Sequence, residues 1–148
     1  MNELDTFLET TLSRLKAADT ALHSGDASQR IAMWSQTDPV TLFGAAVTNS
    51  GWDGVRATFD WLGSRFSNCT SFDYEVVAAG VSGDLAYIVG LEHTTASIGD
   101  APPSDYSLRV TTIFRREDGE WKIVHRHGDP YDATSALAIT RLDAGTSR

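Results

Sequence analysis

Apolar residues recur every three or four positions near the start of the chain. They are Leu4, Phe7, Leu8, Leu12, Leu15 and Leu22. This spacing predicts an amphipathic helix over residues 3–23, which Gly25 ends. The segment 26–29 (Asp-Ala-Ser-Gln) has the pattern of a capping box, which predicts a short second helix as far as Trp34. Pro39 then forces an extended exit, so residues 40–43 are expected to form a short strand.

A third helix follows, and its pattern is the clearest in the chain. It opens with Ser50-Gly-Trp-Asp53, a second capping-box pattern, and its apolar positions are spaced three, four, three and four apart. These positions are Trp52, Val55, Phe59, Leu62 and Phe66. We expect this helix to cover residues 50–66.

The amino-acid composition changes from residue 71 onward. Segments rich in β-branched and aromatic residues cover 72–82, 84–98, 106–116 and 120–128, with turn signals at Gly83-Asp84 and Asp118-Gly119. Helices followed by long antiparallel strands predict an α+β domain, with helices on one face of the sheet. We expect a single domain over residues 1–132 and a C-terminal tail, 133–148, that is partly helical or frayed.

The turn of the last hairpin predicts which of its side chains share a face of the sheet. With Asp118 and Gly119 as the loop, Phe114 opposes Ile123, and directly opposed residues share a face. Continued in the same register, one face is Val110, Thr112, Phe114, Arg116, Trp121, Ile123, His125 and His127. The other face carries the cations Arg109, Arg115, Lys122 and Arg126, and burying an unpaired cation is costly. The pattern therefore predicts that the face with the two histidines turns inward, and a slip of one residue would reverse this.

The bulk composition excludes several classes of function. Hydrophobic residues make up 41% of the chain and charged residues 22%, and the formal net charge is −8. A field of this sign repels phosphate groups, so nucleic acid and anionic membrane surfaces are not expected partners. The only cysteine is Cys69, the N-terminus does not have the pattern of a signal peptide, and no stretch is long enough to span a bilayer. We expect a cytoplasmic protein.

The candidate catalytic side chains lie on the predicted strands. His125 and His127 are candidate general acid and base groups, because imidazole titrates near neutral pH; the alternative is two histidines satisfied by Thr112 and by the backbone. Glu92 and His93 are adjacent, so only one faces inward; a carboxylate in an apolar pocket is a third candidate acid or base. Two histidines provide too few ligands for zinc, and no phosphate-binding loop is present, so neither metal nor cofactor is expected.

The order of these elements resembles the nuclear transport factor 2-like superfamily over residues 3–130. The most specific part is the ending "RREDGEWKIVHRHGDP". Within the superfamily the chain is similar to SnoaL-like and ketosteroid isomerase-like proteins, and its last hairpin is similar to the association domain of calcium/calmodulin-dependent kinase II. The resemblance implies a cone-shaped barrel, in which a curved, mixed but mostly antiparallel sheet wraps around the N-terminal helices. It also implies a homodimer formed through the outer face of the sheet.

The resemblance implies a deep pocket, and it leaves two classes of function open. Isomerases of this fold have a carboxylate base at a position that corresponds to Leu42, and pocket arginines of the kinase domain correspond to Glu92 and Thr112. A cofactor-independent isomerase, cyclase or dehydratase acting on a small apolar molecule through His125, His127 and Glu92 is one expectation. A non-catalytic ligand-binding or oligomerisation module is the other. The expected pocket residues are Trp52, Tyr106, Thr112, Phe114 and Asp38.

Overall fold

The computed structural model describes residues 2–44 and 46–144. Its helices are α1 (Glu3–Leu22), α2 (Ser28–Met33), α3 (Trp52–Arg65) and α4 (Ala133–Ala144). Its strands are β1 (Thr41–Phe43), β2 (Thr48–Ser50), β3 (Phe66–Ser82), β4 (Leu85–Ile98), β5 (Ser104–Glu117) and β6 (Glu120–Pro130). The α+β class expected from the sequence is therefore confirmed, and the strand β2 is an element that the hydrophobic pattern did not predict.

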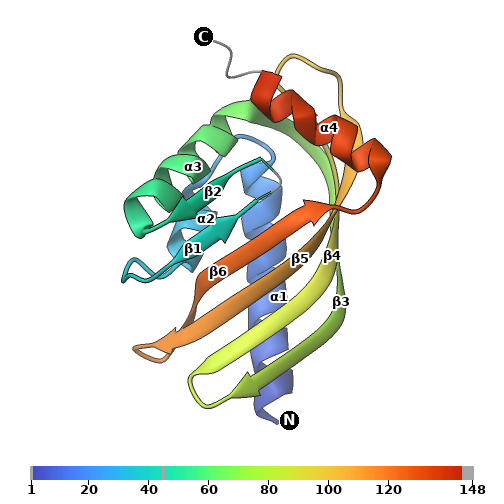
Figure 1. The fold of residues 1–148 in the computed structure, drawn as a ribbon. Coiled ribbons are helices and arrows are strands. Elements are labelled where there is room, and N and C mark those ends of the chain that lie inside the picture. The colour runs from blue at the N-terminus through green and yellow to red at the C-terminus, as the bar shows by residue number, and fades with distance from the viewer. Residues whose placement is uncertain (1, 45, 145–148) are drawn as a thin grey trace.

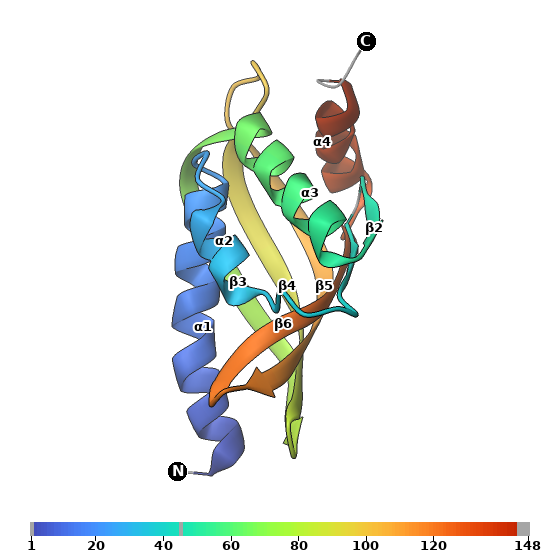
Figure 2. The ribbon, with the colours of Figure 1, turned by 90° about the vertical axis from the view of Figure 1, so that its left-hand side faces the viewer.

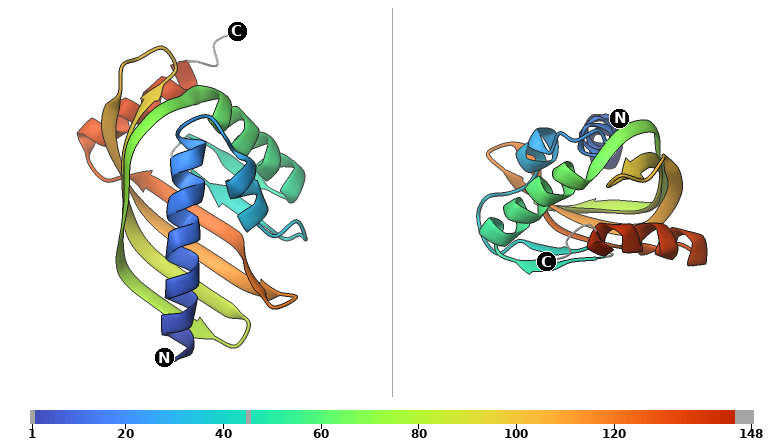
Figure 3. Two further views of the ribbon diagram at one scale, coloured as in Figure 1. Left: turned by 180° about the vertical axis from the view of Figure 1, so that it is seen from behind. Right: turned by 90° about the horizontal axis from the view of Figure 1, so that it is seen from above.

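The six strands form one mixed sheet in the order β2-β1-β6-β5-β4-β3. All neighbouring pairs are antiparallel except β1 with β6, which run parallel. The long strands β3 to β6 bend strongly, and Figure 1 shows them crossing the molecule with α4 lying across one end. Seen from above, the sheet curves from β3 beside α1 to the end of β6 beside α4, as a cone requires (Figure 3).

Helix α1 runs along almost the full height of the sheet (Figure 2). Its N-terminus is capped by the side chain of Asn2, which accepts a hydrogen bond from the backbone N–H of Asp5 at 2.8 Å. The apolar stripe that predicted the helix faces β3, and Phe7, Leu15 and Leu22 are buried there. This helix therefore covers the concave face of the sheet, because its hydrophobic side has no other surface on which to pack.

Two hydrophobic clusters fill the concave side. The larger cluster joins α1, α2 and α3 to the strands, and its members include Phe7, Trp34, Phe59, Ile88 and Phe114, all almost fully buried. A second, smaller cluster lies towards α4 and is made of Phe66, Ala96, Ile98, Tyr106, Leu108, Val110, Ala138, Ile139 and Leu142. The helix α4 thus belongs to a part of the core that is separate from the main cluster. The last four positions of the predicted tail, 145–148, lie outside the described residues.

The β5–β6 hairpin follows the predicted register only over its first half. Glu117 pairs with Glu120 and Phe114 pairs with Ile123, as the Asp118-Gly119 turn predicted. A β-bulge then adds one residue, Val124, to β6, so that Ile113 rather than Thr112 lies opposite His125. A shift of one residue reverses the facing of every later side chain. The prediction that His125 and His127 face inward is therefore wrong.

The short connections are held by side chains. Asp38 precedes Pro39 through a cis peptide bond, and its carboxylate accepts a hydrogen bond from the backbone N–H of Trp52 at 2.9 Å. It therefore caps the first turn of α3, which receives no side-chain bond from its own N-cap Gly51. The expectation of a capping box led by Ser50 is thus corrected, because the cap comes from a loop distant in sequence. No helix among the described residues is long and apolar enough to cross a bilayer.

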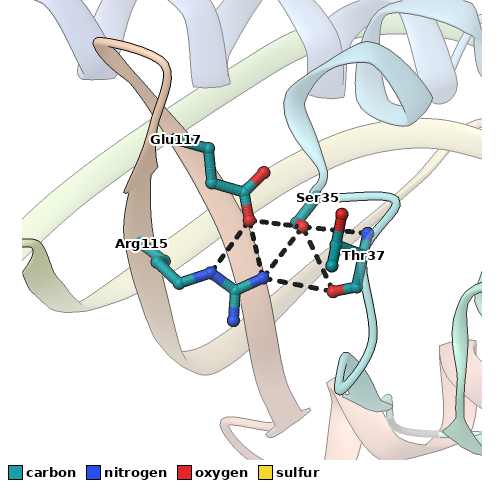
Figure 4. A network of polar contacts seen from close by, with 4 residues as sticks. All are labelled: Ser35, Thr37, Arg115 and Glu117. Atoms are coloured by element: carbon teal, nitrogen blue, oxygen red, sulfur yellow. Dashed lines mark hydrogen bonds and ion pairs between the residues drawn. The ribbon is translucent and has the colours of Figure 1, made fainter.

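A polar network fixes the loop after α2 to the β5–β6 hairpin (Figure 4). Arg115 Nη2 donates to Glu117 Oε2 at 2.6 Å, to Ser35 Oγ at 3.0 Å and to the Thr37 carbonyl oxygen at 3.1 Å. Ser35 Oγ in turn donates to Glu117 Oε2 at 2.7 Å. Because Ser35 is buried, these bonds satisfy polar groups that water does not reach, and they hold the chain where it enters β1.

Candidate functional site

A small cavity of about 60 Å³ lies between the helices and the end of the sheet that α4 covers. Most of its wall is apolar. The apolar side chains of the wall are Leu22, Leu42, Val47, Leu62, Phe66, Leu108, Ile139 and Leu142. Four polar side chains complete it: His23, Arg30, Tyr106 and Arg126. Such a combination, an apolar hollow with a few convergent polar groups, is typical of a site for a small molecule.

His23 and Tyr106 form the central polar pair of this wall. His23 lies directly after α1, its Nδ1 is 2.7 Å from the backbone oxygen of Asp19, and its Nε2 contacts the Tyr106 hydroxyl. A carbonyl oxygen only accepts, so Nδ1 carries the proton and Nε2 accepts the hydrogen bond that Tyr106 donates. Burial lowers the pKa of His23 to about 4, so its imidazole is neutral at neutral pH.

Burial also raises the pKa of Tyr106, because the phenolate would be charged in a place that water does not reach. The nearby negative charge of Glu92 acts in the same direction. Tyr106 therefore keeps its proton, and the pair consists of a neutral acceptor nitrogen and a neutral hydroxyl donor. To act on a bound molecule the two groups must first give up their mutual hydrogen bond, because Nε2 has one lone pair and the hydroxyl has one proton.

Glu92 and Arg126 form a buried ion pair beside this pair of residues. Arg126 Nη1 lies 2.6 Å from Glu92 Oε2 and Nη2 lies 2.8 Å from Oε1. Burial acts to raise the pKa of Glu92, but the charge and hydrogen bonds of Arg126 outweigh it, so the pKa lies below its ordinary value. Both groups are therefore ionised. The sheet decides the parity that the sequence left open, since Glu92 points inward and His93 points outward.

A second buried ion pair joins Asp19 on α1 to Arg30 on α2. The side chains are only 2% and 8% exposed, so the pair links the two helices from inside the core. The two acids and two guanidinium groups balance in charge, which is the condition for keeping four ionised groups out of water. Arg30 and Arg126 have more N–H donors than their carboxylate partners can accept, and both line the cavity.

The two histidines expected in the pocket lie on the opposite face of the sheet. His125 Nδ1 is 2.7 Å from Thr41 Oγ1, and the ring of Phe43 packs edge-on against both imidazoles. Arg126, which was expected on the outer face of the hairpin, is buried instead. Burying the charge of Arg126 is costly, and its ion pair with Glu92 offsets that cost. The sequence alone did not predict that these two side chains meet.

The other residues expected in the pocket lie in different parts of the structure. Tyr106 lines the cavity. Thr112 and Phe114 face inward and are buried, but they lie in the packed interior, and Phe114 contacts Phe7 edge-on. Trp52 is half-buried at the margin of the main cluster, and Asp38 is exposed and caps α3. Tyr106 therefore lines the cavity, Glu92 reaches it only through its ion pair with Arg126, and the rest of the expected set lies outside the cavity wall.

The sequence reasoning missed Asp19, His23, Arg30 and Arg126. One signal was present: Asp19 lies four residues after Leu15 and three before Leu22, on the apolar stripe of α1. A carboxylate at a core position of a helix needs a buried partner, and His23 follows it by one turn. Arg126 gave no such signal, because its facing depends on the bulge at Val124.

No group of three or more histidine, cysteine or acidic side chains within residues 2–44 and 46–144 is arranged to hold a metal ion. The cavity offers imidazole, hydroxyl and guanidinium groups, which suit a ligand that carries oxygen atoms. These groups can accept one proton, donate another and stabilise negative charge on an oxygen.

Comparison with known proteins gives a consistent picture. The model of the SnoaL-like domain matches residues 12–131. No curated protein matches the chain. A nuclear transport factor 2-like superfamily protein from Salmonella enterica has 15% identity and a TM-score of 0.65, and the alignment covers 84% of this chain and 95% of that one. At such identity the likeness concerns the fold.

Two further structures carry functional names. A proposed ketosteroid isomerase from Parabacteroides distasonis shares 19% identity with a TM-score of 0.65, over 85% of this chain and 89% of that one. A proposed dehydratase of the same superfamily from Streptomyces avermitilis shares 21% identity with a TM-score of 0.65, over 84% and 99%. Because the family model spans most of its length, this chain belongs to the SnoaL-like domain family, and its fold is that of nuclear transport factor 2-like proteins.

Proposed function

We propose that this chain is a cofactor-independent enzyme that moves a proton on a small, mostly apolar carbonyl compound held in the cavity. The observation that carries the proposal is the hydrogen-bonded pair His23–Tyr106, which lies in an otherwise apolar wall. The names of two structural neighbours, a proposed isomerase and a proposed dehydratase, are in keeping with chemistry of this kind.

In this proposal His23 Nε2 is the base. The Nδ1 hydrogen bond to the Asp19 carbonyl fixes the tautomer, so the lone pair of Nε2 points to the Tyr106 side of the cavity. A base with a pKa of about 4 is comparable in strength to the aspartate that removes a proton next to a carbonyl in ketosteroid isomerase, where the pKa is about 4.6. The base that isomerases of this fold have on the first strand is replaced by Leu42, which lines the cavity.

Tyr106 and Arg126 would stabilise the oxygen of the substrate. When the α-proton leaves, negative charge develops on the carbonyl oxygen, and a hydroxyl or guanidinium donor in a dry site lowers the energy of that charge. Glu92 takes two of the five donors of Arg126 and holds the guanidinium at the cavity. We therefore assign Glu92 the part of a positioning residue.

The size of the cavity restricts the substrate. Pockets for drug-sized ligands have volumes of about 300–1,000 Å³. The closed cavity has about 60 Å³, below the roughly 150 Å³ of an apolar cavity that binds benzene, so even a molecule of one small ring requires the walls to move apart. The fused rings of a steroid do not fit, so we propose a small cyclic or branched carbonyl compound.

The test uses 3-cyclohexenone, whose conversion to the conjugated 2-cyclohexenone is followed by ultraviolet absorbance. We expect turnover by the unmodified chain and a loss of about 10²–10⁴-fold in His23→Gln, the range for removing a general base. Tyr106→Phe should lose part of the rate, and His93→Gln, on the outer face, is the matched control. Equal turnover in His23→Gln and the unmodified chain would refute the role of His23.

A second candidate is a non-catalytic binding or assembly module, favoured by the outer face of the sheet. This face carries exposed apolar side chains, among them Leu85 and Tyr87 at 54% and 45% exposure. A shallow hollow of about 620 Å³ adjoins them and Ile113. Exposed apolar area of this kind marks interaction sites, so we propose a homodimer through this face. Light scattering coupled to size exclusion should report twice the mass of 16.1 kDa, and Tyr87→Glu should halve it.

A further inference from the structure

We propose that α4 is a cap that opens to admit the ligand, and that Ile139 and Leu142 set the size of the molecule that the cavity accepts. This inference rests on the proposed function only in taking the cavity as the ligand site. It concerns how a ligand reaches that site and how large the ligand can be.

The position of α4 in the chain is the first observation. The SnoaL-like family match ends at residue 131, and α4 begins at Ala133. Nevertheless Ile139 and Leu142 are part of the cavity wall. An element outside the matched domain thus closes the site, and Figure 1 shows it lying across one end of the strands.

The attachment of α4 is the second observation. Its apolar contact is made by Ala138, Ile139 and Leu142, while Leu137 on the same helix is 70% exposed. Three hydrogen bonds add to this contact. The backbone N–H of Ser107 donates to Ser135 Oγ at 2.9 Å, Arg141 Nη1 donates to Ser104 Oγ at 3.1 Å, and Arg65 Nη2 at the end of α3 donates to the Arg141 carbonyl oxygen at 3.4 Å. Few buried apolar contacts are the mark of an element that opens locally, before the rest of the fold.

The joint between β6 and α4 is the third observation. β6 ends at Pro130, and the Asp132 carboxylate accepts from the backbone N–H of Ser135 at 2.8 Å, so the helix is capped by its own connecting residue. The backbone N–H of Tyr131 is bonded to the Ser107 oxygen at 2.9 Å. This anchors the joint, and α4 can turn about residues 131–132 as one intact helix.

The walls that α1 and β1 provide cannot open in this way. Leu22 belongs to α1 and Leu42 to β1, and both side chains are packed into the main core cluster. Displacing either of them would expose that cluster to water, whereas lifting α4 exposes only part of the smaller one. The turn that carries Gly44 and Val47 also borders the cavity, and entry there would leave α4 in place.

Hydrogen exchange on the unmodified full-length chain tests the opening. We expect amides of residues 137–142 to exchange at least about tenfold faster than those of residues 108–114 of β5, at denaturant concentrations far below unfolding. In Leu142→Ala, whose cavity is enlarged, added benzene is a probe that needs no catalysis and should slow the exchange of α4 alone. Equal exchange in α4 and β5, or protection by benzene confined to residues near Gly44, would overturn the proposal.

Cavity-enlarging variants test the size limit. Ile139→Ala and Leu142→Ala should each bind benzene at least about tenfold more tightly than the unmodified chain, because apolar cavities of larger volume take up such molecules. Leu137→Ala, on the exposed side of the same helix, is the matched control and should not differ. If an alanine variant does not fold, Ile139→Val provides the smaller step. Unchanged benzene affinity in folded cavity variants would overturn the assignment of these residues.

These measurements are independent of turnover. If His23→Gln leaves isomerisation unchanged while α4 exchanges fast and the cavity variants bind benzene, the catalytic proposal fails and the cap remains. If the catalytic pair is confirmed while α4 is as protected as β5, the cap fails and the function remains.

Discussion

Arg126 on β6 reaches across β5 and binds both carboxylate oxygens of Glu92 on β4, at 2.6 and 2.8 Å. Both side chains are almost fully buried, with 10% and 2% of their surface exposed. The two strands are not neighbours in the sheet, so the contact depends on the length of the arginine and on the curvature that brings the inner faces together. This ion pair holds the polar side of the cavity in place.

Removing one partner of this ion pair should destabilise the fold strongly. We expect Arg126→Met and Glu92→Leu each to lower the free energy of unfolding by about 3–5 kcal/mol, because the remaining charge is left buried without a counter-charge. The double variant should lose far less than the sum of the two, since no isolated charge remains. Urea unfolding followed by circular dichroism measures all four chains, and additive losses would show that the two groups do not interact.

The pKa of His23 predicts a pH dependence of stability. The folded-state value is about 4 and the ordinary value is 6.5, so between these values the unfolded chain binds a proton that the folded chain does not. Stability is therefore fully present above pH 6.5 and falls as the pH is lowered towards 4. From pH 7 to about 5 we expect a loss of about 2 kcal/mol, at about 1.4 kcal/mol for each pKa unit.

Two variants separate His23 from other titrating groups. In His23→Gln the loss between pH 7 and 5 should largely disappear, because no buried imidazole remains to be protonated. Burial and the charge of His127 also lower the pKa of His125, so His125→Gln removes a group that acts with the same sign but is only partly buried. A pH profile of His23→Gln identical to that of the unmodified chain would show that the buried imidazole does not control this window.

The Ser35 network predicts a contrast between a buried and an exposed contact. Ser35→Ala should cost about 1 kcal/mol, because the partly buried Glu117 and Arg115 groups lose the buried hydroxyl as a partner. Arg109→Ala breaks the ion pair with Asp129 on the outer face, where Arg109 is 63% exposed, and should leave stability unchanged. Thermal unfolding of the two variants in parallel checks the contrast, and equal losses would contradict it.

The facing of the histidines predicts their reactivity. Diethyl pyrocarbonate should modify His127 in the folded chain, because this side chain is exposed on the outer face. His23 is 4% exposed and should react far more slowly in the folded chain than after unfolding, because the reagent reaches it only when the cavity opens. Mass spectrometry of peptides from native and urea-treated samples locates the modified residues, and rapid modification of His23 in the native chain would place it at the surface.

Local patterns determined most of the fold. The three-four spacing of apolar residues placed α1 and α3 to within two residues at either end, and the Asp118-Gly119 turn fixed the pairing of Phe114 with Ile123. These features depend on neighbours in sequence, through helix periodicity and turn geometry. The strand β2 was missed because its three residues pair only with β1 and carry no alternation of their own.

The candidate site was decided by tertiary structure. The sequence by itself determined the α+β class and placed histidines, acids and arginines on the strands, Glu92 and Tyr106 among its candidates. It did not determine which of them meet. A single extra residue, Val124, reversed the facing of His125 and Arg126, and the curvature of the sheet brought Glu92 within reach of Arg126. The face of the sheet on which a side chain lies depends on the register of its strand. After a bulge the register is set by packing against neighbouring strands, and the sequence of one strand does not contain that information.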